Sequence, residues 1–287
     1  MKIPDQIFHY LTENHNSEMA LVGCRAGAPD VSYDCCEYDI AIFGKTESNP
    51  QNKIVKLGNN TLEFQGFPKQ GNDISLYKMI PVKTGDFLIS PPRYSEIDIK
   101  RSFKAAGKRR IVDALFNVSK NSINKAEQLN SPLNLKIAAY SLLEGILLMS
   151  EVRPMPIHEL NQLRQLEVKK DIISEAIQTC IECLGIERAT RTILNRSFRA
   201  LKEILKERYD VELLSSKIEF LLNHKLLADC YYYIGRLVCS HLERKDNSSQ
   251  MNYYKLNSIA LDLTSDYENI KKMSALIKRD CKNLLKN

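Results

Sequence analysis

The hydrophobic pattern changes its period near residue 95, and this change constrains the fold more than any other feature of the sequence. Before it, apolar residues alternate in short runs, as they do in β-strands. After it, apolar residues recur about every 3.6 positions to the end of the chain, which is typical of amphipathic helices. The sequence therefore predicts an α+β protein with a mixed-sheet domain at 1–92 and an all-α helical bundle at 93–287.

Short apolar runs in the first part predict its individual elements. They are expected to form a helix at 4–15, strands at 19–23 and 38–44, and a β-hairpin from 53–57 and 61–67. Gly58, Asn59 and Asn60 between the last two runs are typical of a hairpin turn. The run at 74–82 fits either a strand or a short helix.

The second part begins with a helix-capping pattern, Ser95 followed by Asp98. Proline, glycine and polar residues then divide the pattern into helices. These are expected at 96–117, 133–151, 157–184, 187–208, 211–244 and 251–285. The short connections between them favour an antiparallel bundle.

The composition indicates a soluble protein of a reducing compartment. Hydrophobic residues make up 44% and charged residues 26%, a globular balance. The N-terminal MKIPDQIFHY lacks the basic and apolar regions of a secretory signal, and the apolar stretch 137–149 is too short to cross a bilayer. Eight cysteines show neither disulfide-framework nor zinc-site spacing. We therefore expect a cytoplasmic protein with no membrane partner.

The candidate chemistry lies in LVGCRAGAPDVSYDCCEYDIAIF, residues 21–43. An apolar run ends at Gly23, and the next strand begins around Glu37 and Asp39. Residues two apart on a strand project to the same face, so these carboxylates lie side by side. A divalent cation between them relieves their repulsion. Gly23 leaves room for phosphate oxygens to approach the backbone.

This segment resembles the signature of polymerase-beta-type nucleotidyltransferases, including their small prokaryotic members. The shared pattern is an apolar run, glycine, a small residue, a spacer of about a dozen residues and an acidic–apolar–acidic–apolar run. The resemblance implies a magnesium-dependent enzyme that transfers a nucleoside monophosphate from ATP or another nucleoside triphosphate to an acceptor hydroxyl. The acceptor classes left open are RNA, protein and small molecules.

The resemblance also implies roles for individual residues. It implies that Glu37, Asp39 and a third acid are the catalytic and metal-binding carboxylates of this chain. Glu63 fits the third position best, and Asp73 is the alternative. It also implies that Gly23, Cys24 and Arg25 bind the phosphates. The chain departs from the family pattern at two of these positions, because Cys24 replaces the usual serine and Glu37 replaces the usual first aspartate.

Two other functions stay open at this point. The first is a catalytically degenerate module that binds a nucleotide or a partner and dimerises through its helices. The second is an RNase, because the stretch AAYSLLEGILLMSEVRPMPIHELNQLR is similar to HEPN-type domains. RNases of that type use an arginine followed four to six residues later by histidine, a spacing found in Arg153–His158 and Arg236–His241.

The tyrosines of the helical part have two interpretations. They could stack on nucleic-acid bases, or they could form a subunit interface. We favour the interface, and with it a homodimer formed through the helical domain. The residues concerned are Tyr231, Tyr232, Tyr233, Tyr253 and Tyr254.

Overall fold

The computed structural model describes most of the chain. The described residues are 3–15, 17–43, 53–67, 74–84, 87–88, 94–120, 131–167, 171–207, 209–243, 254–264 and 266–286. Their contacts form two compact units. Unit 1 contains Met1–Ser102 and Arg208–Lys217, and unit 2 contains Phe103–Glu207 and Ile218–Asn287. The domains expected at 1–92 and 93–287 stay a prediction.

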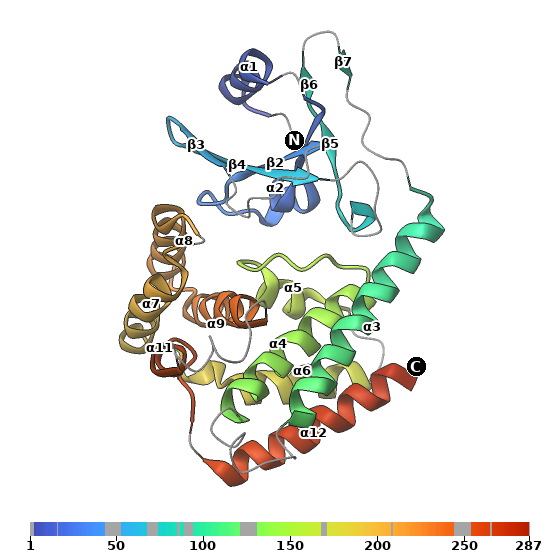
Figure 1. The fold of residues 1–287 in the computed structure, drawn as a ribbon, viewed down its shortest axis with the longest axis vertical. Coiled ribbons are helices and arrows are strands. Elements are labelled where there is room, and N and C mark those ends of the chain that lie inside the picture. Colours follow the sequence, from blue (N-terminus) through green and yellow to red (C-terminus); the bar gives the residue numbers. More distant parts are fainter. Residues whose placement is uncertain are drawn as a thin grey trace. The chain divides into compact units, whose positions relative to one another are not determined.

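Unit 1 is built on a five-stranded mixed sheet with the order β3-β4-β2-β1-β5. The β2 and β4 strands run parallel, whereas the other neighbouring strands are antiparallel. Figure 1 shows helices α1 and α2 beside this sheet. The bounds are α1 Asp5–Asn14, β1 Met19–Val22, α2 Gly23–Gly27, β2 Tyr38–Phe43, β3 Lys53–Leu57, β4 Asn60–Phe67 and β5 Ile80–Pro81.

Apolar side chains of the strands and of α1 form the core of this unit. Leu21, Ile40 and Leu62 come from three neighbouring strands, and Ile7 and Leu11 of α1 pack in the same cluster. All four residues of β1 are buried, whereas along β4 the buried Leu62 and Phe64 alternate with the partly exposed Glu63 and Gln65. The core thereby fixes which side chains are left at the ends and edges of the strands.

The hairpin expected from the sequence is present. Its strands β3 and β4 pair in antiparallel register, with Leu57 opposite Asn60. Gly58 in the turn has a φ of +58°, a conformation that glycine adopts without steric cost. The undecided run at 74–82 contains both alternatives, a short 3₁₀ helix at Ile74–Leu76 followed by β5. A short ribbon of β6 (Lys83–Thr84) and β7 (Phe87–Leu88) follows.

Unit 2 is helical. Two of the three boundaries between the units fall inside helices, after Ser102 and after Lys217, and the third, after Glu207, falls between helices. The predicted capping pattern is present at the start of α3, where the Ser95 Oγ accepts a hydrogen bond from the Asp98 backbone amide at 3.1 Å. The helices are α3 Glu96–Lys120, α4 Ser131–Met149, α5 Glu159–Gln165, α6 Asp171–Leu184, α7 Arg191–Leu205, α8 Val211–Asn223, α9 Leu227–Glu243, α11 Tyr254–Ala260 and α12 Tyr267–Lys286.

Three of the long helices expected from the sequence are not continuous, so these predictions are wrong: each expected helix forms two helices. The one expected at 211–244 is broken between α8 and α9, where Lys225 has a φ of +60°. The one expected at 251–285 is broken after α11, where Asp262 has a φ of +47°. A left-handed residue ends a helix, and neither residue is the glycine that usually marks such a position. The segment 157–184 likewise forms α5 and α6.

The α4 helix forms the centre of unit 2, with α5, α6, α9 and α12 packed against it. Among the described helices it is the one long and apolar enough to cross a membrane, but 83% of its apolar window is buried inside the protein. Such burial fits the core helix of a soluble protein. A close glycine contact joins it to α3, since a Cβ on Gly107 would lie 2.9 Å from the Met149 backbone nitrogen.

One lysine is buried inside this helical core. Lys136 on α4 is 4% exposed, and its ammonium donates a hydrogen bond to the carbonyl oxygen of Leu184. Burial, together with repulsion from Arg188, lowers the pKa of Lys136 from 10.5 to about 8. The folded state therefore holds this charge at a cost to stability.

Replacing Lys136 with Met should raise the free energy of unfolding by about 3 kcal/mol at pH 7, because a pKa fall of this size opposes the charged form by about that much. The Leu184 carbonyl keeps a donor in the variant, the Tyr231 hydroxyl at 3.3 Å. Since the folded-state pKa is the lower one, the unfolded lysine binds more protons between pH 8 and 10.5, and the advantage of Met shrinks as the pH rises through this window. Urea unfolding of both proteins at pH 7 and near pH 10 measures this difference, and an equal gain at both values would contradict it.

Candidate active site of unit 1

The sheet topology brings three carboxylates together. Asp39 on β2 lies directly opposite Glu63 on the parallel strand β4. Glu37 precedes β2 by one residue and is two positions from Asp39, so both project to the same side. One oxygen from each of Glu37, Asp39 and Glu63 lies within 4.8 Å of the other two. These are the three acids that the sequence pattern singled out, whereas the alternative Asp73 lies outside the described residues.

Gly23 forms the other side of this site. The register of β1 and β2 pairs Val22 with Asp39, so the turn that follows β1 begins beside that carboxylate. Gly23 has a φ of +73°, and a Cβ added to it would lie 1.8 Å from Asp39 Oδ2. Glycine is thus required here both for its backbone conformation and for the space that the carboxylate occupies.

The orientation of the carboxylates suits a divalent cation. The Glu37 Oε2 atom is buried and has no hydrogen-bond partner among the described residues. Asp39 Oδ1 accepts a hydrogen bond from the Gln65 amide at 3.3 Å. Carboxylate oxygens are the ligands that Mg²⁺ prefers, and a buried carboxylate oxygen without a donor is costly unless a cation compensates it. The three acids therefore fit a hard divalent ion.

A lysine from a distant part of the chain completes the site. The Lys217 ammonium on α8 lies 2.7 Å from Glu37 Oε1, and residues 208–217 belong to unit 1. Both side chains are largely buried, at 11% and 12% exposed. Lys217 could not be predicted as part of this site, because it is separated from Glu37 by 180 positions and lies in an ordinary helical pattern. Gln65 was not predicted either, although strand alternation places it on the same face as Glu63.

Cys24 and Arg25, the other residues that the resemblance implies for phosphate binding, have protein partners in this structure. A hydrogen bond with the Cys36 thiol, followed by burial and the nearby carboxylates, raises the pKa of Cys24, so its thiol stays protonated at neutral pH. The Arg25 guanidinium donates to the Cys36 carbonyl at 2.6 and 3.0 Å, and it lies 4.3 Å from the centre of the Tyr38 ring. Arg25 therefore braces the segment that leads into β2.

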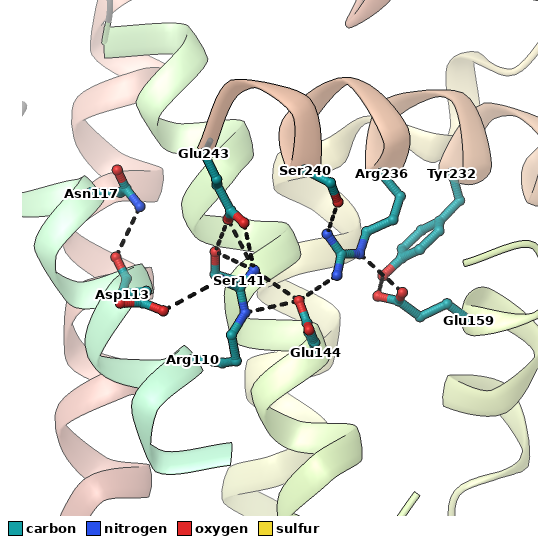
Figure 2. A network of polar contacts seen from close by, with 10 residues as sticks. All are labelled: Arg110, Asp113, Asn117, Ser141, Glu144, Glu159, Tyr232, Arg236, Ser240 and Glu243. Atoms are coloured by element: carbon teal, nitrogen blue, oxygen red, sulfur yellow. Dashed lines mark hydrogen bonds and ion pairs between the residues drawn. The ribbon is translucent and has the colours of Figure 1, made fainter. Parts of the chain in front are cut away.

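The arginine–histidine pairs of the helical part do not form an open site. Arg236 and His241 on α9 are 7% and 5% exposed. Arg236 forms ion pairs with Glu144 and with Glu159, the latter at 3.1 Å, and Figure 2 shows it between these two carboxylates. The other candidate histidine, His158, is fully buried before α5 without a side-chain cap. These contacts give no support to an RNase centre.

Arg236 belongs to a larger buried polar network. Arg110 of α3 bonds to Glu144 at 2.9 Å and forms an ion pair with Glu243 at 2.9 Å. The Tyr232 hydroxyl donates to Glu159 at 2.6 Å. Figure 2 shows how the chain of contacts joins side chains from several helices of unit 2. Removing one partner from such a buried ion pair would leave the other charge uncompensated in a poorly solvated interior.

Most of the tyrosines that were expected to form a subunit interface are core residues. Tyr231, Tyr232 and Tyr233 are 6%, 0% and 5% exposed within one chain, so the interface interpretation is wrong for them. The Tyr140 and Tyr232 rings pack edge to face at 5.0 Å. Tyr253 lies outside the described residues. Aromatic side chains at helical spacing serve the core here, which is their commoner use.

Comparisons of this chain with protein-family models, with curated proteins and with solved structures found no match. The function is therefore inferred from the residues and their geometry.

Proposed function

We propose that this chain is a magnesium-dependent nucleotidyltransferase that moves a nucleoside monophosphate from ATP or another nucleoside triphosphate to an acceptor hydroxyl. The observation that carries the proposal is the convergence of the Glu37, Asp39 and Glu63 carboxylates beside Gly23. The resemblance of residues 21–43 to polymerase-beta-type nucleotidyltransferases supports the same reading. The acceptor class, the dimer and the cytoplasmic location stay predictions.

Each residue of the site has a definite task in this proposal. Glu37, Asp39 and Glu63 hold the metal, which when bound neutralises phosphate charge and assists the attack of the acceptor hydroxyl. Gln65 keeps the Asp39 carboxylate in place through its hydrogen bond. Gly23, which has no side chain, leaves the turn open to phosphate oxygens. The protonated Cys24 lines this turn without acting as a nucleophile, and Arg25 is left out because its guanidinium is bound to Cys36.

A nucleotide-binding module without catalysis is the second candidate. One observation favours it: the Lys217 ammonium already neutralises part of the charge of Glu37. Such a module would bind a nucleoside triphosphate and release no pyrophosphate. The two candidates therefore differ in turnover, whereas both predict nucleotide binding at this site.

Nucleoside triphosphates should raise the melting temperature of the protein only when Mg²⁺ is also present. A nucleotide at a hundred times its dissociation constant adds about 2.7 kcal/mol to the stability of the protein. Thermal unfolding with each of the four common nucleotides, with Mg²⁺ or with a chelator, tests this and ranks the bases. Pyrophosphate release in the same samples separates the enzyme from the binding module. A melting temperature that none of the Mg²⁺–nucleotide pairs changes would refute the proposed function.

A further inference from the structure

The strongest feature that the proposed function leaves unexplained is the cation already seated in the carboxylate cluster. Lys217 Nζ lies 2.7 Å from Glu37 Oε1, and both side chains are nearly nine-tenths buried. A second ion pair, between Lys56 of β3 and Glu212, joins the start of α8 to the sheet. The segment that carries Lys217 is thus held against the sheet of unit 1 at two points.

An ammonium and a divalent ion compete for the same carboxylate. A metal held by Glu37, Asp39 and Glu63 would place two positive charges beside the lysine, and like charges at such short range repel strongly where solvent is scarce. The Glu37 atom bonded to Lys217 is Oε1, while Oε2 is buried without a hydrogen-bond partner among the described residues. One half of this carboxylate is therefore occupied by the lysine, and the other half is available to a metal.

We propose that Lys217 is a built-in competitor of the metal, so that the site takes a divalent ion tightly only when the ammonium moves away from Glu37. This inference rests on the proposed function and concerns how that site is loaded. The phosphates of a nucleoside triphosphate offer the ammonium new negative partners. Metal and nucleotide then favour each other's binding, because each removes an obstacle to the other.

The inference predicts that removing the ammonium tightens the binding of metal alone. In the absence of nucleotide, Lys217→Met should bind Mn²⁺, a spectroscopic substitute for Mg²⁺, at least about tenfold more tightly than the wild type. The free Mn²⁺ signal in electron paramagnetic resonance measures this directly, with no need for turnover. Lys100→Met is the matched control, because it removes the same charge from an ion pair with Glu96 whose side chains are 52% and 82% exposed. Its Mn²⁺ affinity should stay that of the wild type.

A second variant covers the case in which methionine prevents folding. Lys217→Gln keeps a hydrogen-bond donor for Glu37 without the positive charge, and it should show the same gain in Mn²⁺ affinity. In both variants, ATP should enhance Mn²⁺ binding less than it does in the wild type.

The outcomes separate this inference from the proposed function. Equal Mn²⁺ affinity in the wild type and both Lys217 variants would refute the competition between Lys217 and the metal, but it would not refute the metal site itself. Weaker metal or nucleotide binding in the variants also overturns it, since the lysine would then be a ligand of the phosphates. If neither the wild type nor the variants bind Mn²⁺, with or without nucleotide, the proposed function fails and the inference with it.

Discussion

Replacing Asp39 with Asn should reduce magnesium-dependent pyrophosphate release by at least about a thousandfold. Asp39 is the central member of the three acids, since it pairs with Glu63 across the sheet and packs against Gly23. A metal ion contributes several kcal/mol of charge stabilisation in phosphoryl transfer, and each 1.36 kcal/mol changes the rate tenfold. Release of pyrophosphate from ATP is the suitable measurement, because transfer to any acceptor produces it.

The same variant should fold at least as well as the wild type. Asn has nearly the same shape as Asp and removes one of three negative charges that lie close together, so the repulsion within the cluster decreases. Asp34→Asn is the matched control: it changes an exposed carboxylate five positions earlier and should keep full activity. If Asp39→Asn releases pyrophosphate as fast as that control does, the carboxylates are not the catalytic centre.

Replacing Arg236 with Met should lower the free energy of unfolding by about 3 to 5 kcal/mol, the usual cost of removing one partner from a buried ion pair. Glu159 is fully buried, and both Arg236 and Tyr232 bond to it. Burial raises the pKa of Glu159, while Arg236 opposes that effect. Without the arginine, the buried carboxylate has to be protonated or remain poorly compensated. Urea unfolding followed by circular dichroism at the helical band measures the loss.

Two further variants identify the cause of this loss. Adding Glu159→Gln to Arg236→Met should restore part of the stability, because no buried carboxylate is then left without its cation. Arg196→Met is the matched control: this arginine is 57% exposed, and its partner Asp262 also pairs with Arg188 at 3.1 Å. Its loss should stay below about 1 kcal/mol. An equal effect of Arg236→Met and Arg196→Met would show that the network adds little to stability.

The sequence predicted the sheet elements well because their signals are local. The hairpin depends on alternating residues around Gly58, and the α3 cap depends on Ser95 and Asp98, which are close in the chain. The juxtaposition of Glu37, Asp39 and Glu63 was accessible for a similar reason. Two of these acids share a strand face, and the third alternates with apolar neighbours on another strand.

What the sequence did not predict depends on long-range contacts or on a backbone conformation that the residue type seldom adopts. Lys217 is 180 positions from Glu37, and no local pattern connects them. The division between α8 and α9 depends on a left-handed lysine, Lys225, a residue type that seldom marks a helix end. The buried role of Tyr232 was hidden as well, because its hydroxyl is satisfied by Glu159 from a different helix.

The segment 208–217 gives the chain an interleaved design, since it belongs with the sheet although about a hundred helical residues precede it. If recombination moved the first hundred residues alone into another protein, they would therefore carry only a part of unit 1. A graft ending at Ser102 would carry the acids and the glycine turn but would leave behind the positive group that Glu37 contacts. Exchange of this N-terminal segment would keep the contact of Glu37 only where the recipient supplies a helix with a cation at the matching place.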